Sequence, residues 1–262
     1  MIGLSPPRGV YRQTLVIRVA LGIAALVFAG ISFAIGMGSN ASDFPGIAVA
    51  AVILIAYAVI CYLIAKTTIT VYPEGIQRTT AFGTKEMLWS EVAEYRYRIV
   101  PRQTGFAVGG LIGAAVEAAI NVSQGNPGGP PTVTLVGQNG KRLQVTPNFK
   151  DSEEAIDTVL SEVHNRLKPP LKQRLANNDV VSFGPLKLSF QGVGWKNKAP
   201  IPLDDVGNAL ISGRKLRIRR KGKLLDAIGV APEKVPNALL ALELIEELRV
   251  NAGISGVAST FS

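Results

Sequence analysis

Cysteine and histidine are nearly missing from this chain of 262 residues, which has one of each, Cys61 and His164. A single cysteine excludes an intramolecular disulfide framework and a cysteine-rich metal cluster. A single histidine disfavours most zinc centres and any Ser-His-Asp triad. We therefore expect no metal ion and no cofactor, and we interpret His164 as a surface or helix-edge residue.

Recognisable catalytic and phosphate-binding motifs are also missing. The chain has no GxxxxGK[ST] loop, no GxGxxG turn after a strand and no GxSxG elbow. The pair Asp204 and Asp205 could attract a cation, but adjacent strand residues point to opposite faces. A turn or capping role is therefore favoured for this pair. We predict no catalytic residues and a protein that is not an enzyme.

Charge is distributed unevenly along the chain. The net charge is +9, and residues 171–262 supply most of it with fourteen cations and eight anions. Such asymmetry points to nucleic acid, anionic lipid or an acidic protein as a partner. Seven cations lie within the eleven residues Gly213–Lys223 and form our candidate site, the basic hairpin: Arg214, Lys215, Arg217, Arg219, Arg220, Lys221 and Lys223.

Two long apolar runs near the N-terminus contain no charge. Val19–Gly38 has twenty residues and Phe44–Ala65 has twenty-two, and only a short loop joins them. A helix needs about 20 apolar residues to cross a bilayer core. We therefore predict that residues 1–66 are a membrane anchor with two transmembrane helices, at about 19–38 and 44–65.

Cations flank these two runs and predict their orientation. Arg8, Arg12 and Arg18 precede the first run, Lys66 follows the second, and the loop between them has no cation. The positive-inside rule then places both termini in the cytoplasm, so we expect an integral protein of the inner (plasma) membrane. The alternative is a cleaved signal peptide, but the first run exceeds the usual core of about 7–15 residues and a second run follows directly.

The rest of the chain has strands followed by a helix, twice. In the first half, 67–170, Asn139-Gly140 separates two β-rich runs as in a hairpin, and residues 151–167 have the apolar spacing of a helix. In the second half, 171–250, strand-like alternation leads to the basic hairpin and then to an amphipathic helix with Asn237 as a possible N-cap. We interpret residues 251–262 as a flexible tail.

Short motifs recur in the same order in both halves, which indicates a duplication. The matching pairs are Glu74–Ile76 with Gln191–Val193, Leu88–Val92 with Pro202–Val206, and Thr146–Asn148 with Val235–Asn237. The first half is longer because it carries an apolar insert at 101–131. Residues 106–120 of this insert are too short for a span, so they form either a small helix packed on its own domain or an interfacial element.

The order x-G-[IV], [LW]-x-[DE]-V, hairpin, P-N and helix resembles bacterial pleckstrin-homology-like domains on membrane anchors. The motif WSEV at Trp89–Val92 is similar to an early strand of those domains. The resemblance implies an α+β fold with two pleckstrin-homology-like domains, each an antiparallel sheet or barrel closed by a C-terminal helix. It does not imply inositide specificity, because the dense cations lie in a late hairpin and not around the first two strands.

These features favour a non-enzymatic, membrane-anchored protein that presents tandem domains to the cytoplasm for binding a protein partner or anionic lipid headgroups. One alternative is nucleic-acid binding through residues 214–223, which is disfavoured because only Trp195 is available for base stacking. Another is a small transporter or channel accessory subunit, which would have to form a homo-oligomer because two spans make a poor transport path.

The basic hairpin itself has two readings that the sequence leaves open. Leu216 and Ile218 alternate with cations as in a half-buried strand, Lys221-Gly222 suits a turn, and Leu224-Leu225 starts the expected return strand. The cations then form either a solvated outer face or a surface that binds an anionic partner.

Overall fold

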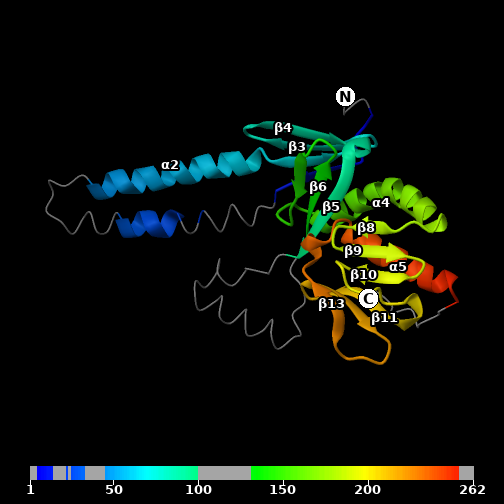
Figure 1. Cartoon of the computed structure of the whole chain (residues 1–262). Coiled ribbons are helices and arrows are strands. Elements are labelled where there is room, and N and C mark those ends of the chain that lie inside the picture. The colour runs from blue at the N-terminus through cyan, green and yellow to red at the C-terminus, as the bar shows by residue number, and fades with distance from the viewer. Residues whose placement is uncertain (1–4, 14–21, 23–24, 33–44, 100–130, 254–262) are drawn as a thin grey trace. The chain divides into compact units, whose positions relative to one another are not determined.

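In its described residues, the computed structural model contains four antiparallel sheets together with helices, which is compatible with the α+β class. Contacts divide the chain into two compact units. Unit 1 consists of residues 1–86, 103–117 and 147–155, and unit 2 of residues 87–102, 118–146 and 156–262. The residues that the structure describes are 5–13, 22, 25–32, 45–99 and 131–253 (Figure 1).

Unit 1 is built around a four-stranded sheet in which strands follow one another in chain order. Alternate residues of its second strand, Ile69 and Val71, are fully buried together with Ile76 of the third. The first strand pairs with the second across a long stretch of chain, with Gly9 opposite Val71. The strands are β1 (Gly9–Arg12), β2 (Thr68–Val71), β3 (Gly75–Thr80) and β4 (Gly83–Leu88), whose last two residues belong to unit 2.

Unit 1 also contains the helix α2 (Pro45–Ala65), which has no charged residue. Large apolar side chains such as Val52, Ile55 and Val59 are exposed along it.

The predicted transmembrane hairpin is contradicted. Among the helices that the structure describes, none combines the length and the apolar character needed to cross a membrane. Of the first predicted span, 19–38, the described residues include only residue 22 and residues 25–32. The predictions of a two-span anchor over 1–66 and of an integral inner-membrane protein with both termini in the cytoplasm are corrected accordingly.

The described residues of unit 2 contain three three-stranded antiparallel sheets, three single turns of 3-10 helix and two long helices, of which the first has residues 152–155 in unit 1. The sheets are β5 (Val92–Ile99), β6 (Pro131–Gly137) and β7 (Arg142–Val145); β8 (Val181–Phe183), β9 (Leu186–Ser189) and β10 (Gly192–Trp195); and β11 (Val206–Ser212), β12 (Lys215–Arg220) and β13 (Asp226–Val230). The helical elements are η1 (Trp89–Glu91), η2 (Leu203–Asp205), η3 (Pro232–Lys234), α4 (Ser152–Ala176) and α5 (Ala238–Asn251).

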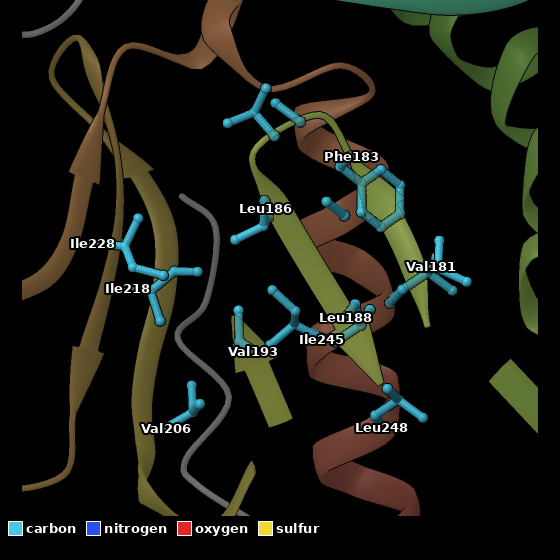
Figure 2. Packing of buried hydrophobic residues seen from close by; sticks show 14 of the residues in the cluster. Val181, Phe183, Leu186, Leu188, Val193, Val206, Ile218, Ile228, Ile245 and Leu248 are labelled. Carbon is cyan, nitrogen blue, oxygen red and sulfur yellow. The ribbon is translucent and has the colours of Figure 1, made fainter. Parts of the chain in front are cut away.

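The core of the second half forms between its two sheets and α5. Figure 2 shows the inward side chains of β9, β12 and α5 gathered in one cluster, including Leu188, Ile218 and Ile245. Each of these three residues is fully buried. The alternation predicted for the strands and the apolar face of the last helix therefore build this core together.

Two stretches of unit 2 share local geometry in detail. Each begins with a turn of 3-10 helix, η1 or η2, and continues into three antiparallel strands, β5–β6–β7 or β11–β12–β13. A register shift interrupts the first pairing of each set, at Val92 and Glu94 in one and at Val206 and Asn208 in the other. We call these two stretches the first meander and the second meander.

The boundaries of the two contact-based units differ from the predicted domain boundaries. Residues of the predicted first domain, 67–170, are shared between the two units, and the second half, 171–250, lies within unit 2. The predicted insert, 101–131, lies outside the described residues except for Pro131, the first residue of β6. The predicted tail, 251–262, is described only as far as Gly253, and α5 ends at Asn251. The domain boundaries stay a prediction.

Candidate functional site

The basic hairpin forms the middle strand of the second meander and the turns at its two ends. Leu216 and Ile218 of β12 are fully buried, so the predicted alternation is confirmed. Arg217 and Arg219 therefore lie on the opposite face, away from the core. The sequence folds this way because apolar and cationic residues alternate with the period of a strand.

Three of the seven predicted cations are paired with carboxylates of the same unit. Arg219 donates from Nε to Oδ1 of Asp226 at 2.7 Å, and Nη1 of Arg217 lies 3.5 Å from Oδ2 of the same residue. Nε of Arg220 lies 3.4 Å from Oδ2 of Asp205. The hydrogen bond from Arg219, assisted by the positive charge of Arg217, lowers the pKa of Asp226. These arginines already have partners in the free protein.

The other four cations, Arg214, Lys215, Lys221 and Lys223, lie at the two ends of β12, and we call them the end cations. All four are exposed, and none forms an ion pair within the described ranges. The structure thus divides the predicted site into a centre of three arginines paired with two carboxylates and two ends with cations that are unpaired among the described residues. A partner with negative charge would meet the end cations first.

Residues Lys221–Leu225 connect β12 to β13, and we call them the β12–β13 loop. Gly222 has a φ of 66°, and the amide of Lys223 donates to the carbonyl of Arg220 at 3.1 Å. Leu224 and Leu225 are 91% and 84% exposed, although the sequence predicted that they start the return strand. That prediction is wrong, because β13 begins at Asp226, opposite Arg219, so both leucines belong to the loop that precedes the strand.

A second polar cluster lies inside unit 2 and was not predicted. The hydroxyl of Tyr95 in β5 lies 2.7 Å from Nε2 of His164 in α4 and accepts a hydrogen bond from the amide of Leu240 at 3.0 Å. On the other side of the ring, Nδ1 of His164 lies 3.3 Å from Oε2 of Glu243 in α5. Glu243 also accepts a hydrogen bond from Lys168 at 2.6 Å. We call these groups the Tyr95 cluster.

The backbone of Tyr95 is held as firmly as its side chain. Its amide donates to Oδ1 of Asn237 at 2.8 Å, and the amide of Asn237 donates to the carbonyl of Tyr95 at 2.9 Å. Asn237 directly precedes α5 as predicted, but its side chain does not cap the helix. It instead joins the first meander to the beginning of the last helix.

The Tyr95 cluster has a structural role, because its hydrogen bonds and ion pairs link β5 to α4 and α5. Burial raises the pKa of Tyr95, so its hydroxyl stays protonated and able to donate. Burial also lowers the pKa of His164, although Glu243 acts in the opposite direction. The His164 side chain is 19% exposed, so the residue is partly buried on α4, which agrees with the predicted helix-edge position and not with a fully exposed surface position. Its place beside Val163, at the border of the apolar stripe of α4, was the one sequence signal for this burial.

No arrangement for metal binding is found among the residues that the structure describes. They contain no group of three or more His, Cys, Asp or Glu side chains placed to hold a metal ion. Asp204 and Asp205, which the sequence analysis considered as a cation site, both lie in η2. Asp205 forms an ion pair with Arg220.

Comparison with known proteins identifies a family but no activity. A family model described as "Family of unknown function (DUF6585)" matches residues 123–253. This match covers half of the chain, which therefore belongs to that family. No curated protein matches the chain, and no solved structure matches it. The matched range includes the basic hairpin, β6, β7 and both long helices of unit 2.

Proposed function

We propose that this member of the family is a non-enzymatic binding module with two pleckstrin-homology-like halves. Its basic hairpin, residues 214–223, binds the anionic headgroups of a lipid surface. This contact needs no membrane-spanning helix, because the exposed ends of a surface hairpin make it.

The repeated local geometry supports the two related halves. In the first meander, the amide of Gln138 donates to the carbonyl of Glu91 at 2.9 Å, and Glu91 is the last residue of η1. In the second, the amide of Lys221 donates to the carbonyl of Asp205 at 2.8 Å, and Asp205 is the last residue of η2. A helix follows each meander, α4 in the first half and α5 in the second. This order is that of the resemblance.

The observation that carries the binding function is the exposure of the end cations. Arg214, Lys215, Lys221 and Lys223 have no ion pair in the described part of the chain, while the arginines between them do. Each cation close to an anionic membrane surface contributes about 1 kcal/mol, and this contribution decays within a Debye length. Four such groups supply useful affinity without a shaped pocket.

The alternatives are supported less well. Nucleic-acid binding calls for exposed aromatic side chains beside the cations, whereas the large exposed side chains beside them are Leu224 and Leu225. A transporter or channel subunit would need membrane spans, and that prediction is corrected above. An acidic protein partner offers the same charge as a lipid surface, so the experiment has to distinguish the two.

The experiment measures how the full-length protein partitions onto phosphatidylcholine vesicles with and without phosphatidylserine. The read-out is the ratio of the two partition coefficients, so contributions common to both vesicles cancel. We expect the variant R214Q/K215Q/K221Q/K223Q to lower this ratio at least about tenfold, since up to four contributions of about 1 kcal/mol are lost.

The matched control is K141Q/R142Q, which removes two exposed cations from the hairpin of the first meander. It should leave the ratio within about twofold of the native value, because distant charges are screened. An equal fall in both variants would show that net charge alone acts. A native ratio near one would overturn the lipid proposal in favour of an acidic protein partner.

A further inference from the structure

We infer that the β12–β13 loop inserts Leu224 and Leu225 between lipid headgroups, so that the loop is the membrane-contacting tip of unit 2. This inference rests on the proposed function and adds to it an apolar contact at a defined place. The recognised partner is a bilayer interface, which offers anionic groups outside and apolar chains beneath them.

The two leucines are exposed where the fold does not use them. They are 91% and 84% exposed, and neither belongs to the core cluster of the second half. The strand β13 begins only after them, at Asp226. Exposed leucines are common singly, but two adjacent ones at the tip of a loop form an apolar projection that calls for a partner.

The loop presents cations and leucines side by side. Lys221 and Lys223 are exposed immediately before Leu224 in the chain. At a bilayer interface, cations pair with anionic headgroups while apolar side chains enter the boundary with the acyl chains. A nucleic acid or a free phosphate would satisfy the lysines and leave both leucines in water.

The base of the loop is fixed, so its tip is presented in a defined way. The amide of Lys221 is held by Asp205, and the amide of Lys223 is held by Arg220. Arg220 is in turn paired with Asp205 through its side chain. A loop fixed at its base loses less conformational freedom on insertion than a flexible one.

The test compares L224S/L225S with K221Q/K223Q in the full-length protein, using phosphatidylcholine vesicles with and without phosphatidylserine. We expect L224S/L225S to lower the partition onto phosphatidylserine vesicles about tenfold, because two apolar side chains no longer leave water. The matched control is F82S, which removes an 87% exposed aromatic from the β3–β4 turn of unit 1 and should change little.

A second measurement places the tip directly. In the variant L225W, tryptophan emission should shift to the blue on phosphatidylserine vesicles and be quenched by brominated lipid, relative to the native protein with Trp89 and Trp195. Loss of partition in K221Q/K223Q without any shift in L225W would overturn the insertion and leave the proposed function standing. Unchanged partition in K221Q/K223Q and in the four-cation variant above would overturn the proposed function as well.

Discussion

The two meanders of unit 2 have the same plan and differ in the loop between their last two strands. In the first meander this loop is Gln138–Lys141, which we call the β6–β7 loop, and it has four polar or glycine residues. It is closed by hydrogen bonds from Gly140 to Gly137, from Gly137 to Lys141 and from Lys141 to the side chain of Asn139. The β12–β13 loop has five residues, of which two are lysines and two are exposed leucines.

This difference shows which features the fold requires. The β6–β7 loop demonstrates that a short, self-closing turn completes the meander without any exposed apolar residue. Leu224 and Leu225 are therefore an addition that the architecture does not demand. We interpret this addition as functional, because exposing two large apolar side chains to water is unfavourable and neither side chain packs in the core cluster.

The inward faces of the meanders differ as well. Tyr95 of β5 directly follows Glu94, the first residue paired after the register shift of the first meander. Ala209 of β11 holds the equivalent position in the second meander, directly after Asn208. Tyr95 bonds to His164, Leu240 and Asn237, whereas Ala209 packs against the core of its own half. The first meander is thus joined to the second half, while the exposed cations of the second meander lie at the two ends of β12.

The largest expected effect on stability concerns Gly192, which lies in the motif Gln191–Val193 that recurs between the two halves. Its φ is 150°, and an added Cβ would collide with the backbone oxygen of Ile201. We expect G192A to lower the free energy of unfolding by about 3 kcal/mol, measured by chemical denaturation. The matched variant G194A should cost less than about 1 kcal/mol, because its Cβ would lie 3.6 Å from Cβ of Lys187, an ordinary contact.

The next prediction breaks the link between the first meander and the last helix. The variant Y95F removes the acceptor for the buried amide of Leu240 and the partner of His164. An unsatisfied buried amide costs about 1–3 kcal/mol, so the free energy of unfolding should fall by that amount. The control Y97F has no hydrogen bond to lose within the described residues and should cost about 0.5 kcal/mol or less. Equal losses of unfolding free energy in Y95F and Y97F would contradict the structural role of the Tyr95 cluster.

The pH dependence of stability sharpens the same contrast. His164 faces Tyr95 of β5, Glu243 of α5 and Lys168 of its own helix, and burial lowers its pKa below the ordinary value of 6.5. Between the folded and unfolded pKa values the unfolded chain binds more protons. The stability that the neutral His164 contributes is therefore fully present above about pH 6.5, and it is lost as the pH falls through the pKa of His164 in the folded protein.

Denaturation midpoints recorded at descending pH check this prediction. The native protein should lose stability in the acid window below about pH 6.5. The variant H164Q cannot titrate there, so part of that loss should disappear. A native and an H164Q curve that fall in parallel would contradict a contribution from His164.

The smallest expected effect concerns the paired arginines at the centre of the basic hairpin. The variant D226N should release Arg219 and Arg217 and raise the partition onto phosphatidylserine vesicles about threefold or more. Stability should fall by about 1 kcal/mol or less, because the pairs are partly exposed. The control D204N changes the net charge equally but forms no ion pair within the described segments, and should have a smaller effect.

Local structure was largely predictable from the chain. Asn139-Gly140 predicted the β6–β7 hairpin, which is confirmed by the antiparallel pairing and by a φ of 76° at Gly140. Alternation at Leu216 and Ile218 predicted the buried face of β12, and Asn237 indicated the residue before α5. Each of these signals is local, because a turn, a strand or a helix end depends on adjacent residues.

Features that depend on distant parts of the chain were not predictable. Nothing in Gly9–Arg12 indicates that it pairs with Thr68–Val71. The Tyr95 cluster joins three elements, and a single His164 gives no sign of its partners. The predicted transmembrane hairpin rested on the length and apolar composition of two runs and on their flanking cations, and the described helices do not meet the requirements for a span.

The site was predicted in composition but not in detail. The density of cations identified the basic hairpin, yet only the register shows that Arg219 lies opposite Asp226 and is already paired. Likewise, the turn predicted at Lys221-Gly222 placed the start of the return strand at Leu224-Leu225, whereas β13 begins at Asp226 and its register shifts between Asp226 and Ile228. A one-residue change of register reverses which side chains face outward.

The most direct test of the account exchanges the two loops whose difference it interprets. Residues Lys221–Leu225 are replaced by the sequence of Gln138–Lys141, and the ratio of partition onto phosphatidylcholine vesicles with and without phosphatidylserine is measured for the full-length protein. We predict that the ratio falls at least about tenfold while the free energy of unfolding changes by less than about 1 kcal/mol. An unchanged ratio in a stably folded exchange variant would contradict the central claim that the β12–β13 loop binds an anionic lipid surface.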